Sequence, residues 1–138
     1  MVITKKIKLN TKGDTDIINI TAEVSSAVLN SGMESGSATV FVPGSTGGIT
    51  TVEYEPGLVD DLKKFFEKIA PKSGEYQHNI RWQDGHGYSH VRASLLGPGI
   101  TVPFVNNKIL LGKWQQIIFI DFDNRPRERE IIVQIIGE

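Results

Sequence analysis

The segment QIIFIDFDNRPREREIIVQII, residues 116–136, holds two apolar runs separated by a polar turn. The first run, IIFI at 117–120, favours a strand because it is short, apolar and rich in β-branched residues. Residues 123–126 supply the Asp, Asn and Pro of a turn. The following stretch, REREIIVQII at 127–136, alternates and predicts a strand that passes from solvent into the core. From its residues alone, this second strand implies no chemistry.

Six further strands are predicted outside this segment. They are VITKKIKL at 2–9, TDIINIT at 15–21, SATVFVP at 37–43, GITTVEYEP at 48–56, ITVPFV at 100–105 and KILLGKW at 108–114. The Gly and Asn/Asp residues of 10–14 predict a hairpin that joins the first two of these strands. An Asn-Asn turn separates the last two. The second half of the chain is therefore expected to be almost entirely β.

Two helices are predicted in the first half. Thr21 is a candidate N-cap for a helix over 22–31, which Gly32 would end. The segment PGLVDDLKKFFEKIAP at 56–71 has apolar residues at helical spacing, acidic residues near its start and a proline at its end. Two helices with about eight strands, and no regular βαβ alternation, predict an α+β class for one domain over residues 1–138.

Composition excludes several function classes. The 138 residues include no cysteine, so disulfides, thiolate metal sites and cysteine nucleophiles are excluded. With 15 basic and 16 acidic residues, the net charge of −1 favours neither nucleic acid nor a membrane surface as a partner. The apolar runs are too short to span a bilayer, and MVITKKIKLN lacks the pattern of a signal peptide. We therefore expect a soluble, cytoplasmic protein that acts on a small molecule.

All three histidines of the chain, His78, His86 and His90, lie in QHNIRWQDGHGYSH, residues 77–90. His86 and His90 are four residues apart, which on a helix places them on one face, but the glycines flanking His86 argue against a helix. On strands, QDGHG at 83–87 would be the turn of a hairpin that brings His78 across from the other two. Three imidazoles with one open coordination position suit a catalytic metal.

The groups that would complete this metal site are carboxylates. Asp84 and the pair Glu53 and Glu55 are the candidates, either as ligands or as hydrogen-bond partners of ligands. The alternative is that the histidines lie on a surface loop or make ordinary hydrogen bonds. Clustering of the only three histidines makes these two interpretations about equally plausible.

A second candidate is the loop of Ser45, Thr46, Gly47 and Gly48. Glycines and small hydroxyls allow successive backbone N–H groups to converge on a phosphate. The alternative is a glycine-rich turn between two strands, since no Gly-Lys-Ser/Thr motif follows. Arg92 is a candidate for bidentate binding of a phosphate or carboxylate, although an ion pair at the surface is commoner.

Several longer strings resemble one family. FVPGSTGGITTVEYEPGLVDDL, YQHN, GHGYSHVRASLLGPGITVPFVNNKILLGKWQQIIFIDFDNRPRER and IIVQIIGE are similar to the YjbQ-like family, often labelled secondary thiamine-phosphate synthase. The resemblance runs from about residue 18 to the end. It implies an α+β fold with a mixed, mostly antiparallel β-sheet sandwich and helices packed outside. It also implies a homotrimer, or a multiple of one, with a histidine-containing pocket near the subunit interface where a metal ion binds.

The resemblance also ranks the candidate residues. His78 in YQHN and His90 in SHVRASLLG match the family pattern best, and Glu53 matches a family glutamate. His86 lies where relatives vary. PGSTGG departs from relatives that read PHTTAA, in which a histidine stands at the position of Gly44. If that histidine is a ligand in those relatives, this chain has lost it or has replaced it with His86.

Three functions are expected from these features. The first is thiamine-phosphate synthesis, in which Arg92, Lys108, the 45–48 loop and a divalent ion, magnesium or zinc, would stabilise the leaving diphosphate. The second is a zinc-dependent hydrolase, with the histidines as ligands and Glu53 as general base. The third is a trimeric protein that binds a metal or a ligand without turnover.

Overall fold

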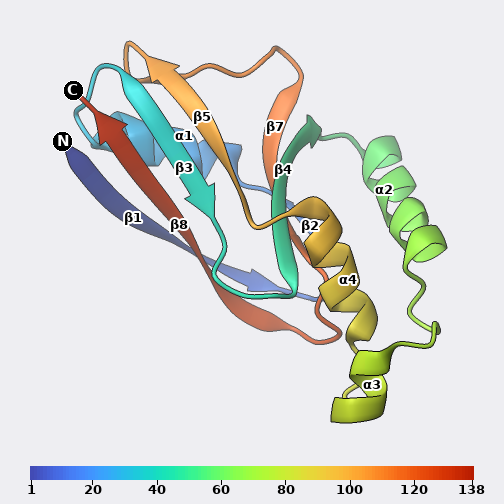
Figure 1. Ribbon diagram of the computed structural model, residues 1–138. Coiled ribbons are helices and arrows are strands. Elements are labelled where there is room, and N and C mark those ends of the chain that lie inside the picture. Colours follow the sequence, from blue (N-terminus) through green and yellow to red (C-terminus); the bar gives the residue numbers. More distant parts are fainter.

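The computed structural model describes residues 1–138, which form eight strands and four helices (Figure 1). The strands are β1 (Val2–Thr11), β2 (Asp16–Asn19), β3 (Gly36–Phe41), β4 (Gly47–Glu53), β5 (Gly99–Val105), β6 (Lys108–Ile109), β7 (Gln115–Asp121) and β8 (Arg127–Gly137). The helices are α1 (Thr21–Asn30), α2 (Pro56–Ile69), α3 (Gln77–Trp82) and α4 (Gly87–Leu96). No helix has both the length and the apolar character needed to cross a bilayer.

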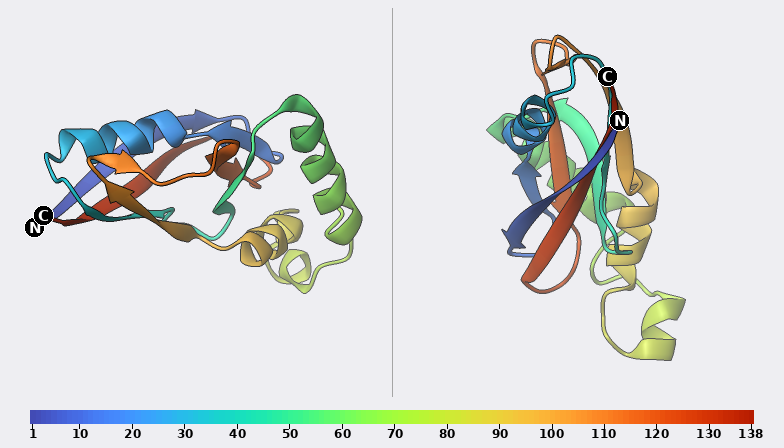
Figure 2. Two further views of the ribbon diagram at one scale, coloured as in Figure 1. Left: turned by 90° about the horizontal axis from the view of Figure 1, so that it is seen from above. Right: turned by 90° about the vertical axis from the view of Figure 1, so that its left-hand side faces the viewer.

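The strands form two sheets. One has five strands in the order β1-β8-β3-β5-β6, and the other has three in the order β2-β7-β4. Every pairing between neighbouring strands is antiparallel, because this chain joins its strands through turns and crossings rather than βαβ units. Helices α2, α3 and α4 gather at one end of the molecule, whereas both termini lie near the opposite end (Figures 1 and 2). The α+β class and the mostly antiparallel sheets are confirmed.

Strand β7 lies at the centre of the core because both of its faces are buried. Ile117 and Phe119 belong to the main cluster between the sheets and α1, which also contains residues of β3, β5 and β8. Ile118 and Ile120 point the other way, into a smaller cluster with Phe66 of α2 and residues of α4. A strand covered on both faces has no solvent side, which explains why IIFI is continuously apolar.

Strand β8 alternates because only one of its faces is buried. Ile131, Val133 and Ile135 point into the main core, and Glu128, Glu130 and Gln134 are exposed. Arg129 has the inward parity and is 6% exposed. A charged residue at a core position needs a partner of opposite charge. The partner of Arg129 belongs to the preceding strand, β7.

That partner is Asp121, the last residue of β7. Arg129 donates from Nε to Oδ2 and from Nη2 to Oδ1, both at 2.8 Å. The Thr11 hydroxyl of β1 donates to Oδ2 at 2.6 Å. Since β7 and β8 belong to different sheets, this bidentate pair fixes the corner at which the chain crosses from one sheet to the other.

The predicted hairpin between the first two strands is wrong. β1 pairs with β8 and β2 pairs with β7, so residues 12–15 form a second corner between the sheets. This corner stacks on the first, because the Asp14 N–H donates to the carbonyl of Asp123 at 2.6 Å. A Cβ at Gly13 would stand 2.5 Å from the carbonyl oxygen of Arg125, so only glycine fits. Local turn chemistry could not distinguish a hairpin from a sheet crossing.

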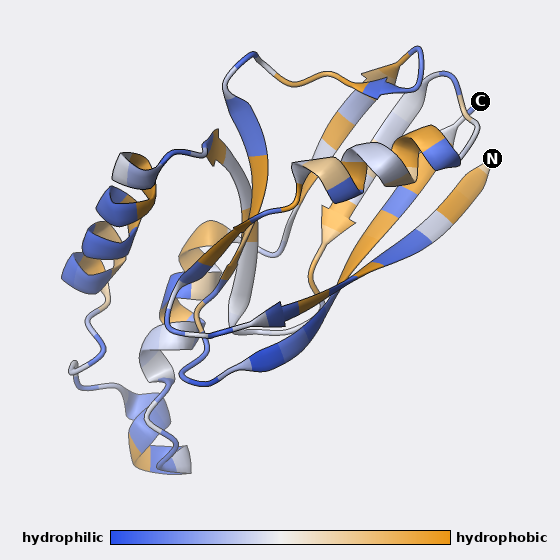
Figure 3. Ribbon diagram, turned by 180° about the vertical axis from the view of Figure 1, so that it is seen from behind, coloured by the Kyte–Doolittle hydropathy of each residue, from blue (hydrophilic) through white to orange (hydrophobic).

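The two predicted helices are confirmed. α1 begins at Thr21, whose hydroxyl accepts from the backbone N–H of Ile117 at 2.8 Å instead of capping its own helix. α2 is amphipathic, and its polar side faces solvent (Figure 3). Its N-cap is Glu55, whose carboxylate accepts from the backbone N–H groups of Gly57 and Leu58. The predicted total of two helices is wrong, because residues 77–96 form α3 and α4 rather than strands.

Replacing Asp121 with asparagine should lower the free energy of unfolding by about 3–5 kcal/mol, because Arg129 would remain buried without its charge partner. Denaturant unfolding measures this. The matched control is Glu130→Gln, which removes an exposed ion pair with Lys6 and should cost under about 1 kcal/mol. Equal losses in the two variants would contradict the assignment of Asp121 as the corner clamp.

The same pair predicts acid sensitivity. Burial raises the pKa of Asp121, but hydrogen bonds from Arg129 and Thr11 outweigh burial, so its pKa lies below the usual value. Its contribution to stability is therefore complete above about pH 4 and is lost as the pH falls through the lower folded value. Unfolding free energies measured from pH 6 downward should fall less steeply in Asp121→Asn than in the wild type. A parallel decline in both proteins would contradict this prediction.

Candidate metal centre

The histidines come together through two short helices rather than a hairpin. His78 lies on α3, His86 occupies the N-cap position of α4, and His90 lies one turn further along α4. The spacing of four therefore does place His86 and His90 along one side of a helix, and the strand interpretation is wrong. The expected juxtaposition of His78 with the other two is present nonetheless.

The glycines that argued against a helix are what allow this one to start. A Cβ on Gly87 would lie 2.6 Å from Cβ of Tyr76, so glycine is needed where α4 meets the beginning of α3. The Gly87 N–H donates to Oδ1 of Asn79 at 2.8 Å, which ties α3 to the first turn of α4. Gln83 and Gly85 have positive φ angles of 56° and 72° and reverse the chain between the helices.

The three imidazoles form a compact triangle. Ring centroids are 4.4 Å apart for His78 and His90, 5.0 Å for His86 and His90, and 5.2 Å for His78 and His86. One ligating nitrogen from each ring lies within 4.8 Å of the other two. All three side chains are half-buried.

Two ring nitrogens in this triangle lack any partner. His86 Nδ1 and His90 Nε2 are buried and make no hydrogen bond, whereas His78 Nδ1 has only a 3.3 Å contact with Asp84 Oδ1. Burial lowers the pKa of His90, and the neighbouring His78 and His86 lower it further, so the neutral, metal-binding form is favoured. Histidines with a purely structural role would satisfy these nitrogens, which argues against the hydrogen-bonding alternative.

Asp84 lies beside the triangle, as expected. Its Oδ2 is 3.1 Å from Nε2 of His86, and its Oδ1 is 3.3 Å from Nδ1 of His78. A carboxylate that holds one nitrogen of an imidazole leaves the other free to bind a metal, which fits the free Nδ1 of His86. Burial raises the pKa of Asp84, but the backbone N–H and the charge of His86 lower it overall.

This donor set fits a borderline metal ion such as Zn²⁺. Three neutral imidazoles with a nearby carboxylate are the ligands of catalytic zinc sites, and they leave a coordination position for water or a substrate. Hard ions such as Mg²⁺ prefer oxygen ligands and fit less well. The residues that would hold the ion are His78, His86 and His90.

Glu53 is not brought to this site within the chain. It ends β4 opposite Gln115, whereas α4 packs near the other end of β4 (Figure 1). Glu53 lines a shallow surface depression that includes Lys113 and Trp114. Glu55 is used as the N-cap of α2. The expected general base and its neighbour therefore lie away from the histidine triangle.

Arg92 points into the protein rather than towards a ligand. Its Nε donates to the carbonyl of Ala70 at 2.9 Å, Nη1 to the Thr15 hydroxyl at 2.8 Å, and Nη2 to Glu67 at 2.7 Å. The guanidinium also lies over the ring of Tyr88. Arg92 is 2% exposed, and its buried guanidinium joins α4 to α2 through an ion pair with the exposed Glu67.

The loop of Ser45, Thr46, Gly47 and Gly48 is also structural in its contacts. Gly47 and Gly48 belong to β4, where a Cβ would strike Phe119 and Leu96 respectively. The Thr46 hydroxyl accepts from Arg129 at 2.7 Å and donates to Asp123 at 3.1 Å. Only Ser45 is exposed. The turn interpretation therefore describes this loop better than a phosphate cradle.

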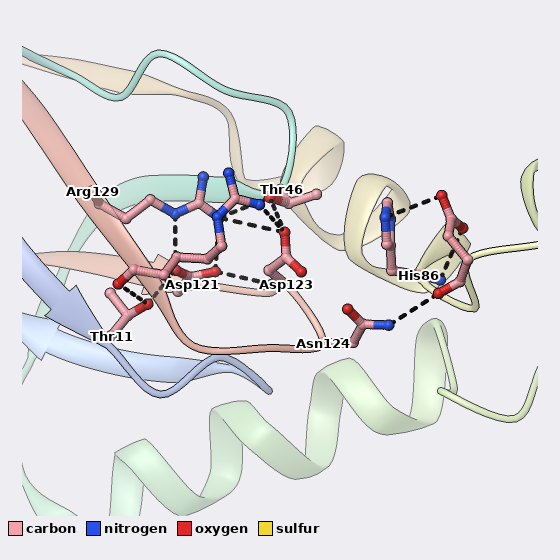
Figure 4. A network of polar contacts seen from close by, with 9 residues as sticks. Thr11, Thr46, His86, Asp121, Asp123, Asn124 and Arg129 are labelled. Carbon is pink, nitrogen blue, oxygen red and sulfur yellow. Dashed lines mark hydrogen bonds and ion pairs between the residues drawn. The ribbon is translucent and has the colours of Figure 1, made fainter. Parts of the chain in front are cut away.

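The structure adds residues that sequence patterns did not single out. Asn124, in the corner between β7 and β8, donates from its side chain to the carbonyl of Asp84 at 3.1 Å (Figure 4). The preceding Asp123 is 2% exposed and lies between the Arg129 network and the turn carrying His86 (Figure 4). The only signal in the sequence was that both residues occupy a polar turn between apolar strands.

Comparison with known proteins places this geometry in a family. The family model described as "UPF0047 protein YjbQ-like" matches residues 5–138. The chain belongs to the UPF0047 (YjbQ-like) family. A UPF0047 protein of Methanothermobacter thermautotrophicus is 37% identical over 99% of this chain and 94% of its own length. UPF0047 protein YugU of Bacillus subtilis is 30% identical over 96% of this chain and 98% of its own.

Solved structures of UPF0047 relatives confirm the fold. A YbjQ-like protein of unknown function from Sulfolobus solfataricus has a TM-score of 0.95 at 30% identity, covering 100% of this chain and 99% of its own. An uncharacterised YjbQ/UPF0047 protein from Clostridium acetobutylicum has a TM-score of 0.88 at 38% identity, covering 96% and 99%. These matches confirm the family and the α+β sandwich that the resemblance implied.

Replacing Gly87 with alanine should destabilise the α3–α4 unit by about 1–3 kcal/mol, because the added methyl group overlaps Tyr76. Hydrogen exchange of α3 and α4 amides measures the loss. Gly112→Ala is the control, since its nearest contact would be 3.6 Å away and the change should stay within about 0.5 kcal/mol. Unchanged protection in Gly87→Ala would show that the helix junction tolerates a side chain.

Proposed function

We propose that this protein binds one divalent metal ion, zinc in preference to magnesium, through His78, His86 and His90, and uses it in hydrolysis of a small-molecule substrate. The observation that carries the proposal is the set of three histidines that each bring one ligating nitrogen within 4.8 Å of the other two, with buried His86 Nδ1 and His90 Nε2 unpartnered. An unpartnered buried nitrogen costs about 1–3 kcal/mol, which a bound ion would offset.

When bound, such an ion supplies Lewis acidity and a water of lowered pKa. The chain supplies the rest. Asp84 holds the His86 ring through Nε2, which presents Nδ1 to the site. The α3–α4 junction fixes the separation of His78 from the two histidines of α4. Half-burial of the three rings limits, without closing, the access of solvent and small molecules.

Thiamine-phosphate synthesis has less support. That reaction needs positively charged groups around the leaving diphosphate. The groups predicted for this role make other contacts in the structure. Arg92 is saturated by Ala70, Thr15 and Glu67. The 45–48 loop turns its polar groups towards Arg129 and Asp123. The site as folded therefore favours activated water over diphosphate departure.

A third possible function is metal binding without turnover. The expected homotrimer matters for this alternative, because it decides whether Glu53 can reach the site. Glu53 lies too far along β4 to act as the base inside one chain, so a neighbouring subunit is its only route to the site. The trimer stays a prediction, which light scattering of the purified protein tests. Cytoplasmic location also stays a prediction.

Metal analysis of histidine variants tests the central claim. Wild-type protein should hold one equivalent of zinc, and His78→Ala, His86→Ala and His90→Ala should each lose it. Asp84→Asn should retain zinc with about 10–100-fold weaker affinity, because it only orients a ligand. Glu53→Gln is the matched acidic control and should bind as the wild type. Unchanged zinc content in His78→Ala and His90→Ala would overturn the site.

An activity panel separates the three functions. A panel of phosphate esters and amides should show turnover that a chelator abolishes and added zinc restores. Stoichiometric zinc without any turnover would indicate a binding protein. Formation of thiamine phosphate from its two precursors, lost in His90→Ala, would indicate the synthase instead.

A further inference from the structure

Five polar atoms of buried side chains make no hydrogen bond in this protein. Besides the three histidine nitrogens, they are Ser89 Oγ and Asp123 Oδ1. Ser89 directly precedes His90 on α4, and Asp123 lies in the corner after β7. Asp123 Oδ1 is the one carboxylate oxygen among these five atoms, and three imidazole ligands of a metal ion do not account for it.

Asp123 is divided between two environments. Its Oδ2 accepts from Arg127 Nη1 at 2.8 Å and from the Thr46 hydroxyl at 3.1 Å, and lies 3.9 Å from Nη2 of Arg129. Its Oδ1 accepts nothing. One oxygen is thus held firmly by the corner network, and the rigid carboxylate presents the other with a free lone pair.

The corner that carries Asp123 is hydrogen-bonded to the turn that carries His86. Asp123 lies in Figure 4 on the side of the arginine network that faces His86. The next residue, Asn124, holds the turn of Asp84 through its side-chain amide. The corner and the histidine turn are therefore fixed to one another.

We propose that Asp123 Oδ1 is the acceptor for an O–H or N–H group of a ligand bound at the histidine site, and that it selects ligands carrying such a donor beside their metal-binding atom. This inference rests on the proposed metal site and adds a specificity-determining residue to it. Asp123 accepts from the ligand and is not itself one of the three metal ligands.

The chemistry favours this assignment over a purely structural one. The corner is already clamped by Asp121 and Arg129, and Arg127 neutralises Asp123 from the Oδ2 side. Oδ2 of Asp123 makes all of this carboxylate's side-chain contacts with the corner, and the buried Oδ1 adds no hydrogen bond to them. Ligands that are anions without a proton would meet an uncompensated lone pair there, whereas hydroxyl or hydroxamate groups would donate to it.

The test uses Co²⁺ as a spectroscopic substitute for zinc and two probes, acetohydroxamate, which carries donors, and azide, which does not. Asp123→Asn should keep the wild-type affinity for Co²⁺ and should bind acetohydroxamate roughly ten- to a hundredfold more weakly, with azide binding not weakened. Arg127→Gln, which alters only the Oδ2 side, should retain the preference for acetohydroxamate.

The outcomes separate this inference from the metal site. Loss of Co²⁺ binding by Asp123→Asn to the extent seen in His90→Ala would make Asp123 a ligand and overturn the inference. Equal changes for both probes, or none, would also overturn it. Failure of the wild type to bind Co²⁺ would overturn the metal site itself. If Asp123→Asn does not fold, the wild-type Co²⁺–acetohydroxamate crystal structure decides, and an Oδ1 facing no donor overturns the inference.

Discussion

The buried pair of Arg129 and Asp121 is the constraint on which the rest of this structure depends. It joins the last residue of β7 to the third residue of β8, at the one point where these neighbouring strands leave one sheet and enter the other. Thr11 adds β1 to the same carboxylate. A charge pair costs desolvation energy, so its value here lies in specifying the crossing rather than in adding stability.

The same corner connects the sandwich to the candidate site. Asp123 and Asn124 follow the clamp closely, and the Asn124 side chain donates to the carbonyl of Asp84 in the segment that carries the histidines. Helix α4 packs on the sheets through Ala93, which belongs to the smaller core cluster, and is joined to α2 by the ion pair of Arg92 with Glu67. The α4 part of the site, with His86 and His90, thus acquires the rigidity of the sheets behind it, which preorganised ligands require.

The sequence predicted the strands and the long helix because their patterns are local. IIFI, REREIIVQII and the stripe of α2 each carry their own period, and they form as expected. Which strands pair is not local, so the hairpin at 10–14 was wrong. The prediction that Gly87 argues against a helix was wrong for a related reason. Gly87 is required because Tyr76, eleven residues earlier, leaves no room for a side chain, and not because the chain turns there. A better signal was Gly97-Pro98, a typical helix end after HVRASLL.

For the candidate site, clustering in sequence was sufficient to identify the histidines, whereas roles that depend on tertiary contacts were not predictable. Arg92 and Thr46 have the chemistry of ligand-binding residues, yet their partners lie far away in sequence. The helix that carries His78, α3, is only weakly attached to α4. α3 buries no residue of its own and exposes Ile80 and Trp82, so little besides Asn79 holds it to α4. An ion shared by His78 and the α4 histidines would cross-link the two helices, and its binding free energy would become stability of this unit. Metal binding and local order at this end of the molecule are therefore coupled.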